Sequence, residues 1–167
     1  MDLRALQRPL KEKYRSDPSA SLIYLEARAS QSALPVSCSV DIGRAVYAAE
    51  AHSGVGGPGT GACSGDLLLG ALAACAQITC QMVAAAMGFP LKNVDVVVSG
   101  DLDLRGTLGI SREVPVGFER ISCRYEIDAP DAAADQLVAL RERTERYCVV
   151  YQTLSSPPTV DTTWSIA

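Results

Sequence analysis

The segment from Asp66 to Phe89 constrains this chain most strongly, because it is apolar almost all round. Its alanine, leucine and methionine content favours a helix, with Ser64 as the expected N-cap and Gly88 as the expected stop. A helix without a polar face must either span a membrane or be covered by protein on every side. Length alone permits the membrane, since about 20 apolar residues span a bilayer.

Several features of the same region oppose a membrane span. Gln77 and Gln81 interrupt the apolar run, small residues crowd its centre, and alternating strands with charged turns follow directly. A second hydrophobic segment of this length is absent from the sequence. We therefore predict a buried central helix, covered by a sheet and a partner subunit, and we expect no membrane as a partner.

The predicted strands gather in two groups, one before the long helix and one after it. That grouping indicates an α+β fold, because strands of a doubly wound sheet would alternate with single helices. We expect one domain over residues 1–167, with 1–20 as a helical N-terminal extension. The expected strands cover 21–29, 35–42, 44–51, 91–104, 118–127 and 159–166, and further helices are expected over 3–16 and 132–147.

Net charge, the N-terminal residues and the possible metal ligands narrow the partners and the location that we expect. The formal net charge of -4 opposes a general nucleic-acid binder, which normally carries a basic stripe. The first residues lack the apolar core of a secretory signal, so we expect a cytoplasmic protein. One histidine, His52, and the lack of a C-x-x-C pair oppose a structural zinc site.

The six cysteines have a default interpretation, which is that each is a small packing residue. In a reducing compartment one or two of them could still be reactive thiols. Cys80 lies about 140° round the helix from Cys75, so these two do not form an obvious pair. Cys38 and Cys123 alternate with strand residues and are expected in the core, whereas Cys63 borders a glycine-rich loop and stays a spare redox candidate.

Three blocks of the sequence resemble the OsmC/Ohr family of osmotically inducible and organic hydroperoxide resistance proteins. They are SGDLLLGALAACAQITCQMVAAAMGF, VPVGFERISCRYEID and RYCVVYQTLSSPPTV. The shared pattern is an acidic residue before Leu-Leu-Leu, a helix running into Ala-Ala-Cys, and a second cysteine after a later helix. The resemblance covers roughly residues 36–165. It implies an OsmC-like fold, with two small antiparallel sheets around a long central helix, assembled as an intertwined homodimer.

The resemblance also implies a thiol-dependent peroxidase that acts on organic hydroperoxides. Cys75 would be the peroxidatic thiol, which is oxidised to a sulfenic acid, and Cys148 would be the resolving thiol. An external dithiol, lipoyl or similar, would reduce the resulting disulfide. Members of the family use no haem, flavin or bound metal, so no cofactor is expected.

A peroxidatic thiol needs its pKa lowered, and the resemblance implies an arginine held by an acidic residue. Asp66 occupies the acidic position, but it lies nine residues from Cys75, which is about 13.5 Å of rise and half a turn out of phase. We therefore expect the acid to come from a partner chain. Helix position alone cannot lower the pKa of Cys75, so a cation is expected to do so. Arg28 is preferred narrowly over Arg44.

Departures from the family pattern leave other functions open. Ser64 and Val149 stand where prolines are usual, and Asp66 stands where glutamate is usual. These changes indicate a divergent branch of the family. A small-molecule or acyl-ligand binding protein without turnover is one alternative. A redox sensor or thiol-transfer protein, in which the disulfide itself is the output, is the other.

Overall fold

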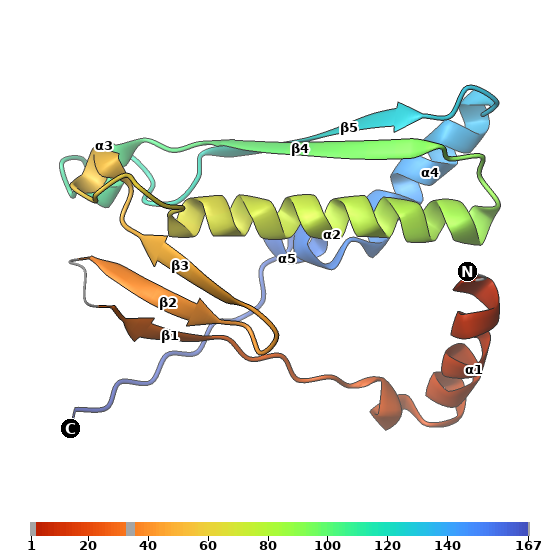
Figure 1. Cartoon of the computed structure of the whole chain (residues 1–167), viewed down its shortest axis with the longest axis horizontal. Helices are drawn as coiled ribbons and strands as arrows, with labels where there is room; N and C mark the ends of the chain where they lie inside the picture. Colours follow the sequence, from red (N-terminus) through yellow and green to blue (C-terminus); the bar gives the residue numbers. More distant parts are fainter. Residues whose placement is uncertain (1–2, 33–35, 167) are drawn as a thin grey trace. The chain divides into compact units, whose positions relative to one another are not determined.

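The computed structural model describes residues 3–32 and 36–166 (Figure 1). Their contacts form two compact units, residues 1–71 with 97–124 and residues 72–96 with 125–167. The single domain expected from the sequence stays a prediction. The secondary structure has two small antiparallel sheets and several helices, as the α+β expectation requires.

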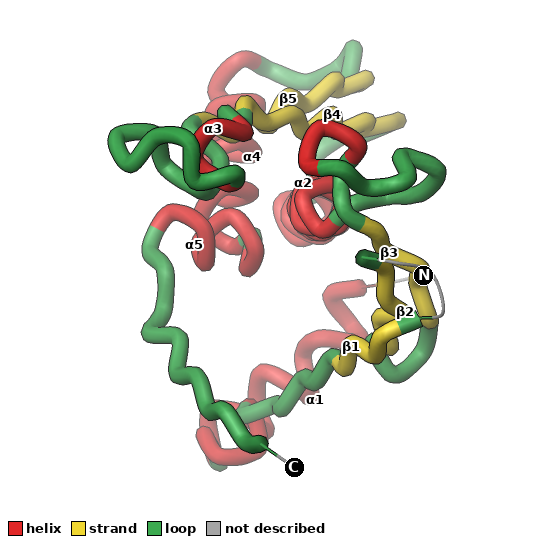
Figure 2. The backbone as a smooth tube through the Cα atoms, turned by 90° about the vertical axis from the view of Figure 1, so that its left-hand side faces the viewer, coloured by secondary structure: helices red, strands yellow, loops and turns green. Residues whose placement is uncertain are grey.

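The first unit contains a three-stranded antiparallel sheet in the order β1-β2-β3 (Figure 2). The register places Cys38 opposite Ala49, whose side chain is buried. No residue of α1, all of which is described, is buried. The elements of this unit are α1 (Leu3–Ser16), β1 (Arg28–Gln31), β2 (Ser37–Asp41), β3 (Val46–Glu50) and the short α3 (Leu104–Thr107).

The glycine-rich loop after β3 is held by hydrogen bonds to Glu50. The Glu50 carboxylate accepts from the Gly61 N–H at 2.6 Å, from the Thr60 hydroxyl at 3.0 Å, and from the Thr60 N–H. The Gly61 N–H is the main cause of the lowered pKa of Glu50. These bonds fix residues Thr60 and Gly61 of the loop, near the start of the long helix.

The long helix α2 (Ser64–Met87) begins at Ser64 itself, the residue that was expected to cap it. Cys63, not Ser64, takes the N-cap place, because its carbonyl accepts from the Leu67 N–H at 3.1 Å. The Asp66 carboxylate accepts from the Cys63 N–H at 2.8 Å, which is half of a capping box. This bond is the first cause of the lowered pKa of Asp66.

The other end of α2 is closed by the predicted glycine. Gly88 has φ +67°, the left-handed region that favours glycine. The Phe89 N–H bonds the Ala84 carbonyl at 2.9 Å, and the Gly88 N–H bonds the Ala85 carbonyl at 3.3 Å. This pair of bonds is a Schellman motif, and it turns the Phe89 side chain into the core of the second unit.

Strands β4 (Asn93–Asp101) and β5 (Arg120–Asp128) form the two-stranded sheet, and α5 (Val149–Ser155) follows α4 (Ala134–Tyr147). The core of the second unit is shared by α2, α4 and the parts of β4 and β5 over residues 93–96 and 125–128. Leu140, Thr144 and Cys148 are buried at intervals of four, so Cys148 continues the apolar stripe while Tyr147 is 60% exposed. The core residues are Cys80, Val83, Ala84, Phe89, Val94 and Leu140.

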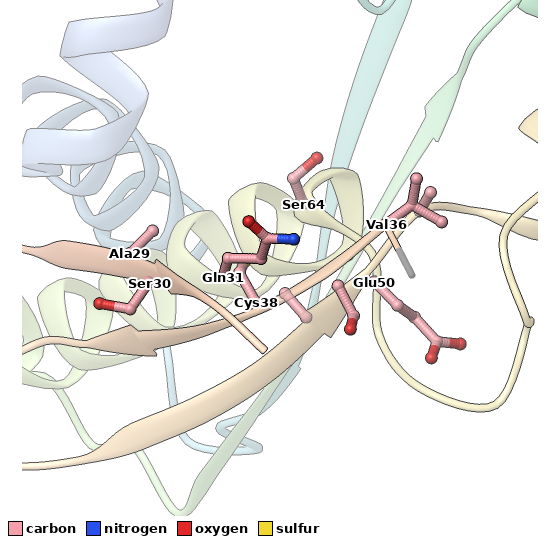
Figure 3. A pocket seen from close by; sticks show the side chains of 10 residues that line it. Ala29, Ser30, Gln31, Val36, Cys38, Glu50 and Ser64 are labelled. Carbon is pink, nitrogen blue, oxygen red and sulfur yellow. The ribbon is translucent and has the colours of Figure 1, made fainter. Parts of the chain in front are cut away.

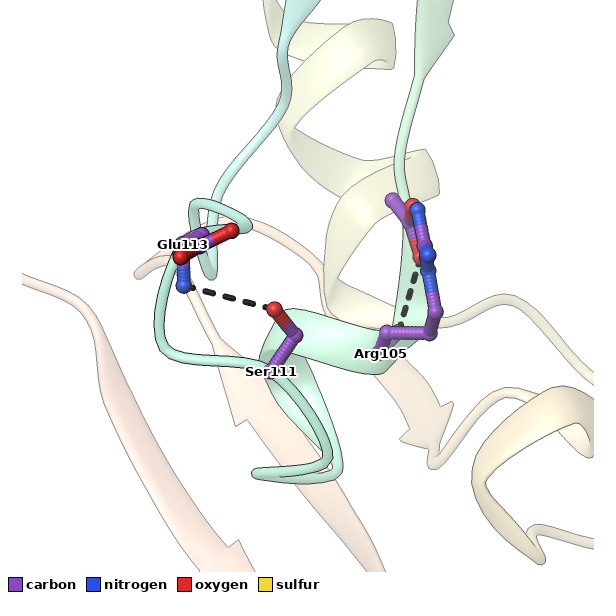
Figure 4. A network of polar contacts seen from close by, with 4 residues as sticks. Arg105, Ser111 and Glu113 are labelled. Carbon is purple, nitrogen blue, oxygen red and sulfur yellow. Dashed lines mark hydrogen bonds and ion pairs between the residues drawn. The ribbon is translucent and has the colours of Figure 1, made fainter.

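The connection between β4 and β5 contains the helical turn α3. Asp103 caps this turn by accepting from the Arg105 N–H at 2.9 Å, and its carboxylate also holds the Arg105 guanidinium (Figure 4). A side chain on Gly106 would meet the Pro115 carbonyl oxygen at 2.3 Å, so glycine is required there. The Glu113 N–H donates to the Ser111 hydroxyl at 3.3 Å.

Two predicted strands are wrong in whole or in part. Of the strand predicted over 21–29, residues 22–27 have no ladder partner among the described residues, and Leu22 to Leu25 are exposed. The strand predicted over 159–166 is not formed, and Trp164 and Ile166 are exposed. Both segments have strand composition, but a strand needs a neighbour to pair with. Pro35, the first residue of the predicted second strand, lies outside the described residues.

The burial of α2 is confined to one side. Its length and composition would allow it to cross a membrane. Within its most apolar stretch of 18 residues, 28% is buried inside the chain. Leu72, Ala76, Cys80, Val83 and Ala84 are buried. A second stripe of small and apolar residues is exposed, namely Ala71, Ala74, Ile78, Met82 and Ala85. The predicted buried helix is therefore covered on one face by its own chain and still needs cover on another.

Replacing glycine by alanine is expected to change the free energy of unfolding in opposite directions at a position inside α2 and at the position just after it. Gly88→Ala should lower the free energy of unfolding by about 1 kcal/mol or more, because alanine is strained at a positive φ. Gly70→Ala should raise it by up to about 1 kcal/mol, since Gly70 lies inside the helix and its added Cβ meets nothing within 4 Å. Urea unfolding of both variants measures the difference, and shifts of the same sign would contradict this account of the helix end.

The cap at the other end predicts that Asp66→Ala lowers the free energy of unfolding by about 0.5–1 kcal/mol at pH 7. Because folding lowers the pKa of Asp66, the stabilisation is present above its ordinary value of 3.8 and is lost as pH falls through the lower folded value. Asp66→Asn, which keeps an acceptor oxygen, should lose less. Asp161→Ala, in the exposed C-terminal segment, is the control. Urea unfolding of Asp66→Ala and the wild type at pH 3 and pH 7 tests the cap. An equal loss of unfolding free energy at both pH values would show that the Asp66 carboxylate does not act as a cap.

Candidate active site

Cys148 is held at the junction of two helices in the second unit. It ends α4 and starts α5 with extended backbone, φ -73° and ψ 107°. Its N–H donates to the Thr144 carbonyl at 3.0 Å, and its carbonyl accepts from the Gln152 N–H at 2.9 Å. Both helices therefore fix the backbone of this residue, and its thiol is fully buried.

Cys75 lies on α2, in the same unit, where its sulfur meets the beginning of α5. The backbone N–H groups of Val150 and Val149 donate hydrogen bonds to it, and so does the thiol of Cys148. These N–H groups belong to the first turn of α5, which has no carbonyl partners for them within the helix. The Cys148 side chain does not cap that turn. The sulfur of Cys75 takes the place of a cap.

The same sulfur has a further polar neighbour on its own helix. The Oγ1 of Thr79 lies 3.9 Å from the Sγ of Cys75, and both residues are partly buried. Thr79 is one turn further along α2, so it lies on the same side of the helix as Cys75. The site therefore places one thiol, one hydroxyl and two backbone N–H groups around the sulfur of Cys75.

These contacts act on the pKa of Cys75 in opposite directions. Burial raises the pKa of the thiol, because it disfavours the thiolate. Hydrogen bonds from Val150, Cys148, Thr79 and Val149 stabilise the thiolate, and together they outweigh burial, so that the pKa lies below its ordinary value. A lower pKa favours the thiolate, which is the nucleophilic form of cysteine.

Cys80, five residues along the same helix, provides an internal comparison. Burial raises its pKa, and the Thr144 hydroxyl opposes that effect only in part. No backbone N–H group is among the causes that act on it. The pKa values of the two thiols on α2 are therefore shifted in opposite directions, although burial raises both.

The cation expected to lower the pKa of Cys75 stays a prediction. The N-terminal turn of α2, the helix that carries Cys75, lies nine residues away at Asp66. The structure supplies the N-terminal N–H groups of a different helix, α5. No sequence rule places α5 against α2, although Val149 keeps an N–H where the family pattern has a proline.

The other two predicted site residues lie in the first unit and have partners of their own. The Arg28 guanidinium pairs with the Glu26 carboxylate at 2.5 Å, with the Arg28 side chain 79% exposed. Asp66 is committed to the Cys63 N–H at the start of α2. Among the described residues the structure pairs neither of them with the other. Arg44, the alternative cation, is exposed in the turn between β2 and β3.

Sequence reasoning missed one arginine that is held by an acid. The Nε of Arg105 lies 2.9 and 3.0 Å from the two carboxylate oxygens of Asp103, and its Nη2 lies 2.5 Å from one of them. Asp103 raises the pKa of Arg105 further above its usual range. The signal was the Asp-Leu-Arg sequence after a strand, which keeps both side chains on one turn. Arg105 joins Arg28 as a candidate cation.

A hollow of about 450 Å³ lies over the three-stranded sheet of the first unit (Figure 3). Its lining includes Cys38, Glu50 and Ser64 together with several small residues. None of the six cysteines, all of which are described, forms a disulfide. Among residues 3–32 and 36–166, no group of three or more His, Cys, Asp or Glu side chains is arranged to hold a metal ion.

Known structures share this fold at low sequence identity. An OsmC-like protein from Mycoplasma pneumoniae is 16% identical with a TM-score of 0.67, over 81% of this chain and 89% of its own. An organic hydroperoxide resistance protein OsmC from Legionella pneumophila is 16% identical with a TM-score of 0.62, over 81% and 92%. One from Elizabethkingia anophelis is 16% identical with a TM-score of 0.64, over 82% and 91%.

The sequence itself identifies the family. No curated protein matches it at a significant level. The family described as OsmC-like protein matches residues 57–163, which is more than half of the chain and includes both Cys75 and Cys148. The predicted OsmC-like fold, with its two small antiparallel sheets, is confirmed by the structures above. The chain belongs to the OsmC family, as a divergent member of it.

Proposed function

We propose that this protein is a thiol-dependent peroxidase that reduces organic hydroperoxides to alcohols. The observation that carries the proposal is the sulfur of Cys75, which accepts hydrogen bonds from the start of α5 and from the thiol of Cys148. Two thiols in contact, one of them with a lowered pKa, are what attack and resolution require. Similar folds occur in proteins named for organic hydroperoxide resistance.

In the first step the Cys75 thiolate attacks the terminal oxygen of the hydroperoxide. A sulfur–oxygen bond forms and the O–O bond breaks, so sulfur is oxidised and the peroxide is reduced. The alkoxide leaves and takes a proton from water to become the alcohol, while the hydroxyl of the peroxide stays on sulfur and makes Cys75 a sulfenic acid. The N–H groups of Val149 and Val150 favour the thiolate before the attack.

In the second step Cys148 resolves the sulfenic acid. Its thiolate attacks the sulfur of Cys75, the sulfur–oxygen bond breaks, and water leaves with the thiol proton. The Cys148 side chain already lies against the target sulfur, so a small movement suffices. An external dithiol of the lipoyl kind then reduces the disulfide by two successive exchanges and becomes a cyclic disulfide itself. We place this reaction in the cytoplasm, where such reductants operate.

We further propose a homodimer in which the partner completes the site. The exposed stripe on α2, which includes Ile78 and Met82, needs apolar cover that a second copy of the helix can supply. Arg28 has one described partner, Glu26, and is largely exposed, so it is available to a neighbouring chain. The Asp66 side chain is also exposed, so a partner's arginine can approach it. Arg105 is the alternative cation.

A second candidate function is small-molecule binding without turnover. The observation that favours it is the hollow over the three-stranded sheet, in the unit that does not contain Cys75. A ligand held there would need no thiol chemistry. Steady-state assays separate the two functions, because binding alone consumes no hydroperoxide.

The peroxidase proposal predicts different failures for its two cysteines. Cys75→Ser should abolish reduction of cumene hydroperoxide by dihydrolipoamide. Cys148→Ser should stop the cycle after one event and leave one dimedone-reactive sulfenic acid per chain, because the resolving thiol is missing. Cys80→Ala, which removes the thiol with the raised pKa, should keep turnover near that of the wild type.

These assays use the full-length reduced protein, with alcohol formation followed by chromatography and dimedone adducts by mass spectrometry. The proposal is abandoned if the wild type consumes no hydroperoxide with dihydrolipoamide, dithiothreitol or another dithiol. It is also abandoned if Cys75→Ser and wild type turn over equally. Binding of an apolar dye by a wild type that is inactive would favour the second function.

A further inference from the structure

Thr79 is a polar residue in the middle of an apolar helix, one turn beyond the proposed peroxidatic thiol. Its Oγ1 lies 3.9 Å from the Sγ of Cys75, within hydrogen-bonding range for sulfur. The residues around it on α2 are apolar or small, apart from the glutamines at positions 77 and 81. A hydroxyl at this position therefore needs an explanation.

The ordinary role of a threonine inside a helix is to bond the carbonyl four residues earlier. For Thr79 that carbonyl belongs to Cys75 itself, so the hydroxyl lies over the turn that carries the thiol. The hydroxyl can rotate between the carbonyl and the sulfur, because its hydrogen has no fixed direction. When Cys75 is a thiolate, the negative sulfur is the stronger acceptor of the two.

The position of Thr79 differs from that of the other donors in one respect. Val149 and Val150 follow Cys148 in sequence, so their N–H groups belong to the helix that starts at the resolving thiol. Thr79 and Cys75 belong to the same helix, so their separation does not depend on α5. The threonine hydroxyl therefore depends on no other helix to hold it beside the sulfur of Cys75.

We propose that Thr79 is a positioning residue whose hydroxyl donates a hydrogen bond to the Cys75 thiolate and keeps that sulfur ionised and oriented. The effect on the thiolate stands on geometry, whereas its consequence for turnover rests on the proposed peroxidase function. The same bond assists the last step of the cycle. When an external thiolate attacks the sulfur of Cys148, the S–S bond breaks and Cys75 leaves as a thiolate, which the hydroxyl stabilises.

The test compares Thr79→Val, which keeps the shape and removes the hydroxyl, with Thr79→Ser, which keeps the hydroxyl. The readout is the rate at which iodoacetamide alkylates Cys75 in the full-length reduced protein between pH 5 and pH 10, followed on the Cys75 peptide by mass spectrometry. Thr79→Val should move the midpoint to higher pH and slow alkylation at pH 7 about three- to tenfold, with the plateau at high pH unchanged. Thr79→Ser should retain the wild-type profile.

A control variant and a replacement for an unfolded variant complete the test of Thr79. Thr153→Val, on α5 and exposed, should leave the profile unchanged. If the valine variant does not fold, Thr79→Ala against Thr79→Ser provides the same comparison. An unchanged midpoint in Thr79→Val, or a serine variant as impaired as the valine variant, overturns the proposal. Alkylation needs no hydroperoxide, so a protein without turnover would contradict the peroxidase function and leave this comparison intact.

Discussion

The hydrogen bonds from the first turn of α5 to the sulfur of Cys75 link the fold to the chemistry of this chain. A short helix begins where Cys148 ends α4, and its first N–H groups need acceptors. The sulfur on α2 meets that need, and as a thiolate it meets it best. The same contact caps a helix, lowers the pKa of Cys75, and holds the second thiol next to the first.

The packing of α2 explains why two thiols on one helix behave differently. The buried stripe of α2 runs against Leu140 and its neighbours, and this core surrounds Cys80 with apolar side chains. Cys75 lies one and a half turns earlier, beside the α4–α5 junction and its donors. Burial raises the pKa of both thiols, and at Cys75 the hydrogen bonds outweigh burial and lower the pKa. The stripe of α2 that its own chain leaves exposed is the reason for proposing a second subunit, which would cover it.

The sequence was enough to predict the elements that carry their own signals. The composition of α2, the glycine that stops it and the alternation around Cys123 gave correct helix and strand positions, because these patterns are local. Strands over 22–27 and 159–166 were wrong, since composition does not reveal whether a neighbouring strand is present. The contact of Cys75 with Val150 was also beyond prediction, because it depends on how α5 packs against α2.

The central claim is that Cys75 and Cys148 act as one redox pair, and peptide mapping of a single oxidation event tests it most directly. Fully reduced wild-type protein receives one equivalent of cumene hydroperoxide without any reductant and is then alkylated, digested and analysed by mass spectrometry. The account predicts one alcohol per chain and one disulfide, which joins the Cys75 and Cys148 peptides. A disulfide through Cys63 or Cys80, or a protein left fully reduced with the hydroperoxide intact, would contradict it.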